Sequence, residues 1–536
     1  MRDSMSLLFL LSFIPFFMYM YFVSLKSIHM LQLNFYDENH RYFKWLLKNP
    51  TKVFLTVDMF FVIFAVFITI PSTVCMVLFA LFYLVVLYQN YRATKKEQVK
   101  VKLAITPRVK RLLVTLTIIY LLPFIGFYLG YREEYIYSYY FIMGALVYIN
   151  YFVVMLANII NKPVEHQVFL YYKRKAKKKL DDMQNLKKIG ITGSYGKTSC
   201  KNILNDILNV EFVSSTTPKN YNTTYGMILT VNNYLDKFNE IFIAEMGAFQ
   251  RGDIKQICDF VKPQYGILTR IGTAHLESFG SQTNIQKGKF ELIESLPEDG
   301  IAVLNRDDEL QVDYSLKNKC RVIWIGIDAE DADIRATNLK FDYHGTQFDC
   351  TFKNDPTVYH FETCLLGKNN VYNILGALAL GEAFGISKEK LIAGVKRVKP
   401  IPHRLELKRV GEVNYIHDDY NSNPVGAKAA LDVLKLMPGK RVIVTPGMIE
   451  LGDREYELNL EFGKQIAKVC DEVILVGVNK TKPIYEGLLI EDYPEKKIHV
   501  INNVVLAYAL LQQMKVSGKE LYALFENDLP DQYNEK

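Results

Sequence analysis

The sequence lacks the cysteine spacing that would indicate a disulfide framework or a zinc site. Its cysteines include no C-x-x-C pair, and their number is odd. Scattered free cysteines of this kind are typical of small buried apolar side chains in a reducing compartment. The seven positions are Cys75, Cys200, Cys258, Cys320, Cys350, Cys364 and Cys470.

The sequence also lacks a broad basic stripe or a basic surface interleaved with aromatic residues. The formal net charge is only +7, and the basic excess lies beside apolar segments. Such a distribution argues against a nucleic-acid partner and is better explained by the topology of a membrane protein.

Apolar residues are concentrated in the first 160 positions, whereas the rest of the chain alternates apolar runs with charged and glycine-containing turns. Five stretches approach the roughly 20 apolar residues that a bilayer requires, and we expect each to be a transmembrane helix. The first is not followed by a small-residue cleavage site, so we interpret it as an anchor and not as a signal peptide. The expected spans are residues 5–25, 53–71, 73–91, 112–130 and 135–160.

The distribution of lysine and arginine predicts the orientation of these spans. Residues 26–52 and 95–111 are rich in both, whereas the turns 71–73 and 131–134 hold only Arg132. Basic loops remain in the cytoplasm, so the amino terminus is expected outside and everything after residue 160 inside. The stretch YYKRKAKKK at 171–179 predicts a basic juxtamembrane helix over 161–185.

A phosphate-binding loop is indicated at 187–199, which reads KKIGITGSYGKTS. An apolar strand leads into a glycine turn and then into a helix over 200–208. Gly193 and Gly196 allow close backbone approach to phosphates, Lys197 neutralises them, and the Thr198 hydroxyl can reach Mg²⁺. The general form G-x-x-x-x-G-K-[ST] would need glycine at 191, which is Ile191.

This loop instead resembles the T-G-S-x-G-K-T form of the Mur ligase family, and the resemblance continues over 186–485 in the family order. The similar segments read TPKNYNTTYG at 217–226, IAEMG at 243–247, IGTAHLESFG at 271–280, KGKFELI at 287–293, GKNNVYN at 367–373 and PHRLE at 402–406. Two further segments, HDDYNSNP at 417–424 and PGMIELG at 446–452, resemble motifs of the D-alanyl-D-alanine-adding member.

The apolar segments predict an α-helical membrane domain (1–160) and the basic stretch predicts a helix (161–185), and the resemblance implies that two α/β Mur ligase domains follow. These are a central P-loop ATPase sheet (186–400) and a C-terminal Rossmann-like sheet (401–536). Strands are expected at 441–445 and 472–477. The resemblance implies ATP-dependent amide-bond formation through an acyl phosphate. The apolar spans and the basic loops predict that a multi-pass membrane anchor carries the ligase domains in the cytoplasm.

The resemblance also implies roles for individual residues. The ATP-binding set is Gly193, Ser194, Gly196, Lys197, Thr198, Ser199, Asn370, Asn373, Arg404 and Asp418. Mg²⁺ ligands are Thr198, Glu245, His275 and Lys289, where Lys289 is expected to carry a carbamate and Lys287 is an alternative in the register. Lys197, Lys289, His275 and Glu245 form the catalytic set, and the substrates are expected near Asn220, Asn222, Asn421 and Asn423.

Several departures from the family leave the substrates open. Apolar helices stand where soluble members carry a uridine-nucleotide domain, so the acceptor is either a UDP-muramoyl peptide or a lipid-linked precursor. The basic K-G-S-R turn is replaced by an acidic carboxyl end, and Asn369 and Asn459 stand where histidine is expected. The donor is therefore either D-alanyl-D-alanine or another amino acid, as in polyglutamate, folylpolyglutamate and cyanophycin synthases.

Two rivals from other classes are less well supported. A transporter driven by the P-loop domain would need polar residues for transport deep inside the spans and the signature motif of a paired ATPase. Asp58, near a boundary, is the only charged residue in the five spans, and no such motif is present. A membrane scaffold with an inactive ligase domain would not need Lys197, Thr198, Glu245, His275 and Lys289, all of which are present.

Overall fold

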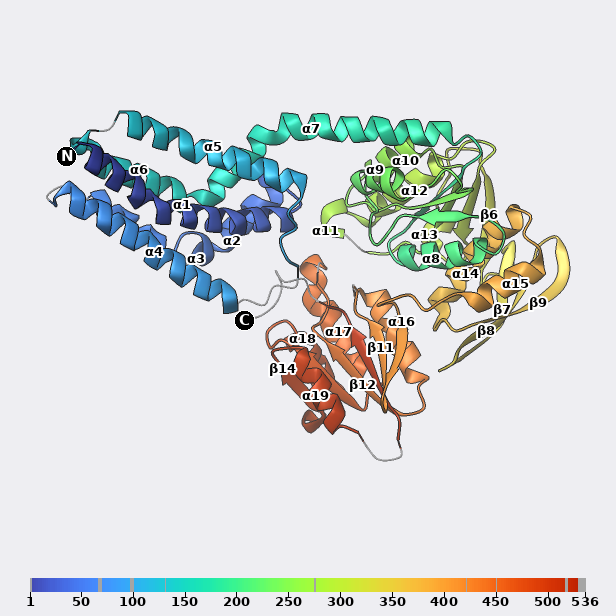
Figure 1. The fold of residues 1–536 in the computed structure, drawn as a ribbon. Coiled ribbons are helices and arrows are strands. Elements are labelled where there is room, and N and C mark those ends of the chain that lie inside the picture. Colours follow the sequence, from blue (N-terminus) through green and yellow to red (C-terminus); the bar gives the residue numbers. More distant parts are fainter. Residues whose placement is uncertain are drawn as a thin grey trace. The chain divides into compact units, whose positions relative to one another are not determined.

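The structure, a computed structural model, describes residues 2–65, 70–96, 101–130, 132–273, 276–420, 422–449, 451–515 and 519–528. The chain forms two compact units, Met1–Tyr171 and Tyr172–Lys536. Their boundary lies inside the long helix α7 (Asn150–Asp182), which is labelled in Figure 1.

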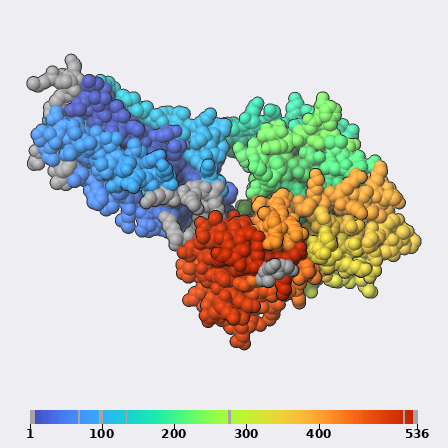
Figure 2. Space-filling view, turned by 60° about the horizontal axis from the view of Figure 1, so that its bottom comes forward, coloured from blue at the N-terminus to red at the C-terminus, as the bar shows by residue number. Residues whose placement is uncertain are grey.

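The first unit is helical. Its aromatic-rich core includes Phe13, Phe16, Phe79, Tyr83 and Tyr140. Exposed apolar side chains are spread over the same unit, which is blue to teal in Figure 2; they include Leu11, Ile14, Met18, Leu81, Leu84, Val114 and Ile118. An apolar surface of this kind fits contact with lipid. The elements are α1 (Arg2–Leu33), η1 (Glu38–Tyr42), α2 (Phe43–Lys48), α3 (Pro50–Val53), η2 (Val57–Ala65), α4 (Ser72–Lys96), α5 (Pro107–Leu129), η4 (Glu133–Tyr135), α6 (Ile136–Tyr148) and α7.

Among the described residues, three helices are long and apolar enough to cross a membrane: Leu7–Leu33, Ser72–Lys95 and Pro107–Leu129. A fourth span results if α6 and α7, which meet at 74°, count as one. The described part of the expected span 53–71 differs from the prediction, because it holds only the last residue of α3 and the 3-10 helix η2 instead of one long helix. Hydropathy measures apolar length and cannot reveal such a change of helix type.

Residues 54–65 and 70 nevertheless lie along α6. The Tyr148 hydroxyl donates to the Phe54 carbonyl (2.8 Å), the rings of Phe61 and Phe141 are 5.3 Å apart, and Tyr137 donates to the Ile70 carbonyl. This segment is therefore antiparallel to α6. Helices α1 and α4 are parallel, because Phe13 contacts Phe79 and Tyr19 contacts Tyr83. Parallel helices require the chain between them to return to its starting side.

The second unit begins with a nine-stranded sheet in the order β2-β3-β1-β4-β5-β6-β7-β8-β9. Neighbouring strands are parallel from β2 to β7, and β7, β8 and β9 are antiparallel. The bounds are β1 (Lys187–Thr192), β2 (Ser214–Thr216), β3 (Ile241–Glu245), β4 (Tyr265–Leu268), β5 (Ile301–Asn305), β6 (Arg321–Gly326), β7 (Ile334–Asp342), β8 (Gly345–Phe352) and β9 (Asp355–Thr363).

Helices cover both faces of this sheet (Figure 1). One face packs on α8 (Lys197–Leu208), α14 (Lys368–Ala383) and α15 (Lys388–Arg397), whose apolar side chains share a core with Ile189, Ile191 and Ile243. The other face carries α9 (Thr224–Asn233), α10 (Asp253–Val261) and α12 (Gln282–Glu294). Two short helices, α11 (Leu276–Phe279) and α13 (Glu309–Val312), complete this part. The nearly continuous apolar strands are typical of a parallel sheet buried on both faces.

The C-terminal part is a six-stranded sheet in the order β10-β11-β15-β12-β13-β14, in which only β10 is antiparallel to its neighbour. Its strands are β10 (Glu406–Val410), β11 (Val413–Asp418), β12 (Lys440–Thr445), β13 (Glu472–Val476), β14 (Ile498–Ile501) and β15 (Leu521–Glu526). Its helices are α16 (Pro424–Lys435), α17 (Glu455–Ala467), α18 (Lys482–Ile490) and α19 (Val505–Gln513). The predicted strands at 441–445 and 472–477 are confirmed, and so is an α/β fold with two sheets.

Candidate active site

The phosphate-binding loop joins the end of β1 to the first turn of α8. Gly193 and Gly196 have φ of +151° and +81°, which glycine adopts without strain. A Cβ on Gly193 would lie 2.0 Å from Thr269 Oγ1, so a side chain there is sterically excluded. The amides at the start of α8 therefore stand open to an anion.

Lys197 folds back over this loop. Its Nζ donates to the carbonyls of Gly193 (2.7 Å) and Ser194 (3.2 Å). Burial lowers the pKa of Lys197, although the nearby Glu245 carboxylate opposes that shift. A half-buried ammonium beside the amides of the helix start is suited to bind a polyphosphate, because the phosphate charge compensates for the water that the lysine has lost.

Glu245 ends β3, the strand beside β1, and its carboxylate faces the loop. The Thr198 hydroxyl donates to it at 3.1 Å, and Asn222 Nδ2 donates at 3.3 Å. Only 2% of Glu245 is exposed. A hydroxyl and a buried carboxylate in contact are the oxygen ligands that Mg²⁺ prefers, so these two residues fit that ion.

Lys201, one turn after Lys197 on α8, is a residue that the sequence reasoning missed. Its Nζ lies 3.2 Å from Glu245 Oε2 and donates to the carbonyls of Thr217 and Lys219, both at 2.8 Å. It is 2% exposed. Lys201 therefore fixes the Glu245 carboxylate and the loop that leads to Asn220 and Asn222. The signal in the sequence was a lysine four residues after Lys197, on the same face of the helix.

Lys289 lies on α12 and is 1% exposed, whereas Lys287 on the same helix is exposed. Its Nζ lies 5.4 Å from the centre of the Phe279 ring. Burial, with a contribution from the charge of Lys197, lowers the pKa of Lys289 to about 7. The sequence did not decide whether Lys289 or Lys287 carries the carbamate. Lys289 is the buried one of the two, and much of its amine is neutral near pH 7.

One cavity of about 290 Å³ brings the phosphate-binding loop together with residues of the C-terminal part. It is lined by thirteen of the residues predicted for the site: Ser194, Gly196, Lys197, Thr198, Ser199, Asn220, Asn222, Glu245, Asn370, Asn373, Arg404, Asp418 and Asn423. Gly193 forms the adjoining turn, and Lys289 lies on α12, outside the lining set. His275 and Asn421 lie outside the described residues.

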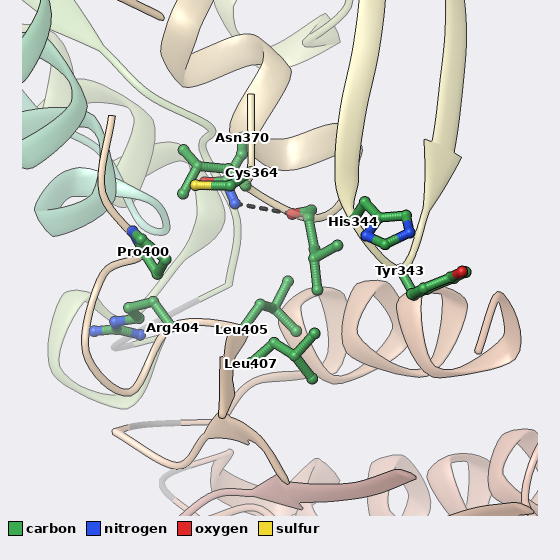
Figure 3. Close-up of a pocket in the computed structure, with 10 residues that line it drawn as sticks. Tyr343, His344, Cys364, Asn370, Pro400, Arg404, Leu405 and Leu407 are labelled. Atoms are coloured by element: carbon green, nitrogen blue, oxygen red, sulfur yellow. Dashed lines mark hydrogen bonds between the residues drawn. The ribbon is translucent and has the colours of Figure 1, made fainter. Parts of the chain in front are cut away.

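A second, smaller cavity of about 150 Å³ adjoins the first, since Asn370, Arg404 and Leu405 line both. Figure 3 shows Arg404 extending away from Tyr343 and His344, while Asn370 donates to the Leu366 carbonyl. A Cβ on Gly196 would lie 3.3 Å from Asn373 Oδ1, so Asn373 lies against the phosphate loop. Asn459, where histidine was expected, bonds to both the amide and the carbonyl of Met448.

A half-buried and a buried carboxyl group stand side by side at the ends of β11 and β15, where Asp418 pairs in register with Glu526. Burial raises the pKa of Asp418 to about 6, and the nearby Arg404 opposes that rise. Burial and Asp418 together raise the pKa of Glu526 well above its ordinary value. Ser422 donates to Glu526 Oε1 at 2.6 Å, and Oε2 has no partner among the described residues.

Replacing Glu526 with glutamine should therefore stabilise the protein, increasingly so as pH rises. A carboxyl whose pKa is higher in the folded state binds more protons when folded, so the wild type loses stability above the unfolded pKa, near 4.5. We expect Glu526→Gln to raise Tm by roughly 2–5 °C at pH 8 and not at pH 4. Glu457→Gln, at an exposed side chain, is the control. A rise that is equal at both pH values would refute the assigned protonation.

Two family descriptions match the chain. Residues 191–381 match the Mur ligase middle domain, and residues 403–519 match the Mur ligase, glutamate ligase domain. The chain is 32% identical over 292 residues to the UDP-N-acetylmuramoyl-tripeptide–D-alanyl-D-alanine ligase of Escherichia coli (strain K12). It is 32% identical over 283 residues to the enzyme of that name from Bacillus subtilis (strain 168).

These matches are partial. They cover 54% and 52% of this chain, and the chain spans 64% and 60% of the two relatives. The MurF ligase of Thermotoga maritima in complex with ADP superposes with a TM-score of 0.58 at 26% identity, over 67% of this chain and 80% of that chain. MurF from Acinetobacter baumannii, with a TM-score of 0.60 at 24% identity over 67% and 77% of the two chains, shares the fold.

Proposed function

The chain belongs to the Mur ligase family, and we propose that it adds D-alanyl-D-alanine to a UDP-muramoyl tripeptide at the expense of ATP. The observation that carries the proposal is the shared cavity, in which the phosphate loop and Glu245 face Asp418 and Asn423. The activity of the E. coli and B. subtilis relatives supplies the substrates of the proposal.

A carboxylate does not react with an amine at neutral pH, because it is a poor electrophile. In the proposed reaction the γ-phosphoryl group of ATP passes to the acceptor carboxylate. The amine of the dipeptide then attacks the acyl phosphate, an amide bond forms, and phosphate leaves. The chain contributes positioning and charge neutralisation, as in other phosphoryl transfers.

Lys197 and the amides of α8 hold the phosphates in this proposal, and Arg404 reaches them from the linker that follows α15. Thr198 and Glu245 hold Mg²⁺, which neutralises charge on the phosphates when it is bound. Asn370, Asn373 and Asp418 surround the nucleoside, while Asn220, Asn222 and Asn423 face the other substrates.

Lys289 carries a carbamate in the proposed active form. A carbamate forms when a neutral amine attacks carbon dioxide, with loss of a proton. A lysine with a pKa of about 7 supplies that neutral amine at physiological pH. The modification replaces an ammonium that repels Lys197 with an anion that attracts both Lys197 and Mg²⁺.

A second acceptor, a lipid-linked muramoyl peptide, is favoured by the apolar helices of the first unit. The two acceptors are distinguished by supplying each of them to the detergent-solubilised protein with ATP, Mg²⁺ and D-alanyl-D-alanine. Phosphate release with the soluble nucleotide supports the principal proposal, and release only with the lipid-linked acceptor supports the second. Release with neither acceptor overturns both.

The first unit anchors the ligase to the membrane, with residues after 160 in the cytoplasm. A reporter fused after Ile160 should therefore give a cytoplasmic signal, and one fused after Lys102, between α4 and α5, should give the same. Basic segments near both positions support this orientation. An extracytoplasmic signal at Ile160 would separate the ligase part from ATP and contradict the proposed topology.

A further inference from the structure

Two histidines and an aspartate that the proposed reaction does not use form a cluster beside the cavity. His403 Nδ1 lies 2.6 Å from Asp419 Oδ1, and His417 Nδ1 lies 3.1 Å from Asp419 Oδ2. One ligand atom from each of the three residues lies within 4.8 Å of the others. We call these residues the His-Asp-His cluster.

The fold brings the three residues together from separate segments. His417 lies on β11 opposite Glu406 of β10, Asp419 follows β11 directly, and His403 precedes β10 in the linker. His403 has a φ of +60°, a left-handed conformation that is unfavourable for a residue other than glycine. The His403 amide donates to Glu406 Oε2 (3.2 Å), and the centre of the His403 ring lies 6.1 Å from that of His417 on β11.

Two residues of the cluster are packed against the protein, and the third is exposed to solvent. The His417 ring lies against Phe525, with ring centroids 5.5 Å apart, and against Tyr415. The side chains of His417 and Asp419 are 16% and 19% exposed, whereas that of His403 is 55% exposed. An ion from solvent therefore has a path to two fixed ligands and a third that can adjust.

The ligand atoms of the three side chains indicate which class of metal ion the cluster can bind. Two imidazole nitrogens and one carboxylate suit Zn²⁺ and similar transition ions, which tolerate three protein ligands and an open position. Mg²⁺ prefers oxygen ligands and is served by Thr198 and Glu245. We propose that the His-Asp-His cluster binds a divalent transition ion of the zinc class, at a site separate from the Mg²⁺ ligands.

An ion bound by the His-Asp-His cluster affects the neighbouring cavity, because Arg404 and Asp418 are next to the cluster in the chain. His403 is joined to Arg404, and Asp418 stands between His417 and Asp419. Arg404 lies 4.5 Å from the centre of the Tyr420 ring, one residue after Asp419. A bound ion joins the linker to the end of β11, and it thereby fixes Arg404 relative to Asp418 in the cavity. The proposal rests on this geometry and stands whether or not the ligase reaction is as proposed.

Cobalt titration tests the site directly. The full-length protein in detergent, stripped with a chelator and kept in excess Mg²⁺, is titrated with CoCl₂. We expect one equivalent to produce the visible absorption of Co²⁺ bound by nitrogen and oxygen ligands, and Zn²⁺ to abolish it. His403→Ala, at a half-exposed side chain, and Asp419→Asn should each weaken binding at least about 100-fold.

His360→Ala is the matched control, because His360 Nδ1 contacts Asp349 Oδ1 at 3.0 Å without a second histidine among the described residues. Binding should be unchanged in that variant. Absorption that persists in His403→Ala and Asp419→Asn, or that never exceeds a small fraction of an equivalent in the wild type, overturns the proposal. Melting curves of each variant show whether a loss of binding reflects a loss of folding.

Discussion

Replacing Lys289 with alanine should lower the rate of ATP-dependent ligation by about 100-fold or more, a loss expected when an anion beside the metal is removed. The side chain is 1% exposed and its pKa is about 7, so the wild type holds a neutral amine ready for carbamate formation. Below about pH 7 this amine becomes protonated. The wild-type rate should therefore fall with decreasing pH and recover partly when bicarbonate is added.

Chemical rescue shows whether Lys289→Ala is inactive because the carbamate is missing or because the protein is misfolded. A short carboxylic acid such as formate or acetate fits the space left by the side chain, and it should restore part of the Lys289→Ala rate without affecting the wild type. Lys287→Ala, at an exposed position on the same helix, should be nearly fully active. Full activity of Lys289→Ala would contradict the assignment of a catalytic carbamate to Lys289. A stable, correctly folded variant that no acid rescues would also contradict the carbamate.

Replacing Lys201 with methionine should produce the second large loss. The change removes the cation 3.2 Å from Glu245 and both hydrogen bonds to the loop at Thr217 and Lys219. Breaking a buried ion pair costs about 3–5 kcal/mol, so Tm should fall markedly. In the protein that remains folded, the Mg²⁺ concentration for half-maximal rate should shift, because Glu245 loses its charged partner and, among the described residues, retains only Thr198 and Asn222.

The Mg²⁺ dependence distinguishes a positioning role from a purely structural one. Lys201→Arg retains the charge but not the shape of the ammonium, so we expect its stability to be partly restored and its Mg²⁺ dependence to remain altered. Lys255→Met, which removes an exposed ion pair with Asp259, should change neither property. A Lys201→Met enzyme with wild-type Mg²⁺ dependence and rate would show that the residue only supports the fold.

Much of the second unit could be predicted from the sequence, because its signals are local. The glycine turn at 193–196, the strand before it and the helix after it depend on residues that are neighbours in the chain. Lys201 and Glu526 were missed because their roles depend on partners far away in sequence. Lys201 is defined by the carbonyls of Thr217 and Lys219, and Glu526 by Asp418 on the adjoining strand.

The first unit shows a different limit. Apolar length correctly indicated α1, α4 and α5, yet it gave no warning that η2 is a 3-10 helix or that the chain turns by 74° between α6 and α7. These features are fixed by tertiary contacts, such as that of Tyr148 with the Phe54 carbonyl and that of Asn150 with Tyr120. Hydropathy sums single residues and contains no information on such pairs.

The mass of the reaction product tests the central claim most directly. The solubilised protein is incubated with ATP, Mg²⁺, UDP-muramoyl tripeptide and D-alanyl-D-alanine, and the mass of the nucleotide product is measured by mass spectrometry. We predict an increase equal to the dipeptide less one water, with one phosphate released per product and neither formed by Lys197→Met. An unchanged acceptor mass, while another amino acid is incorporated in place of the dipeptide, would contradict the proposed donor and leave a ligase of different specificity.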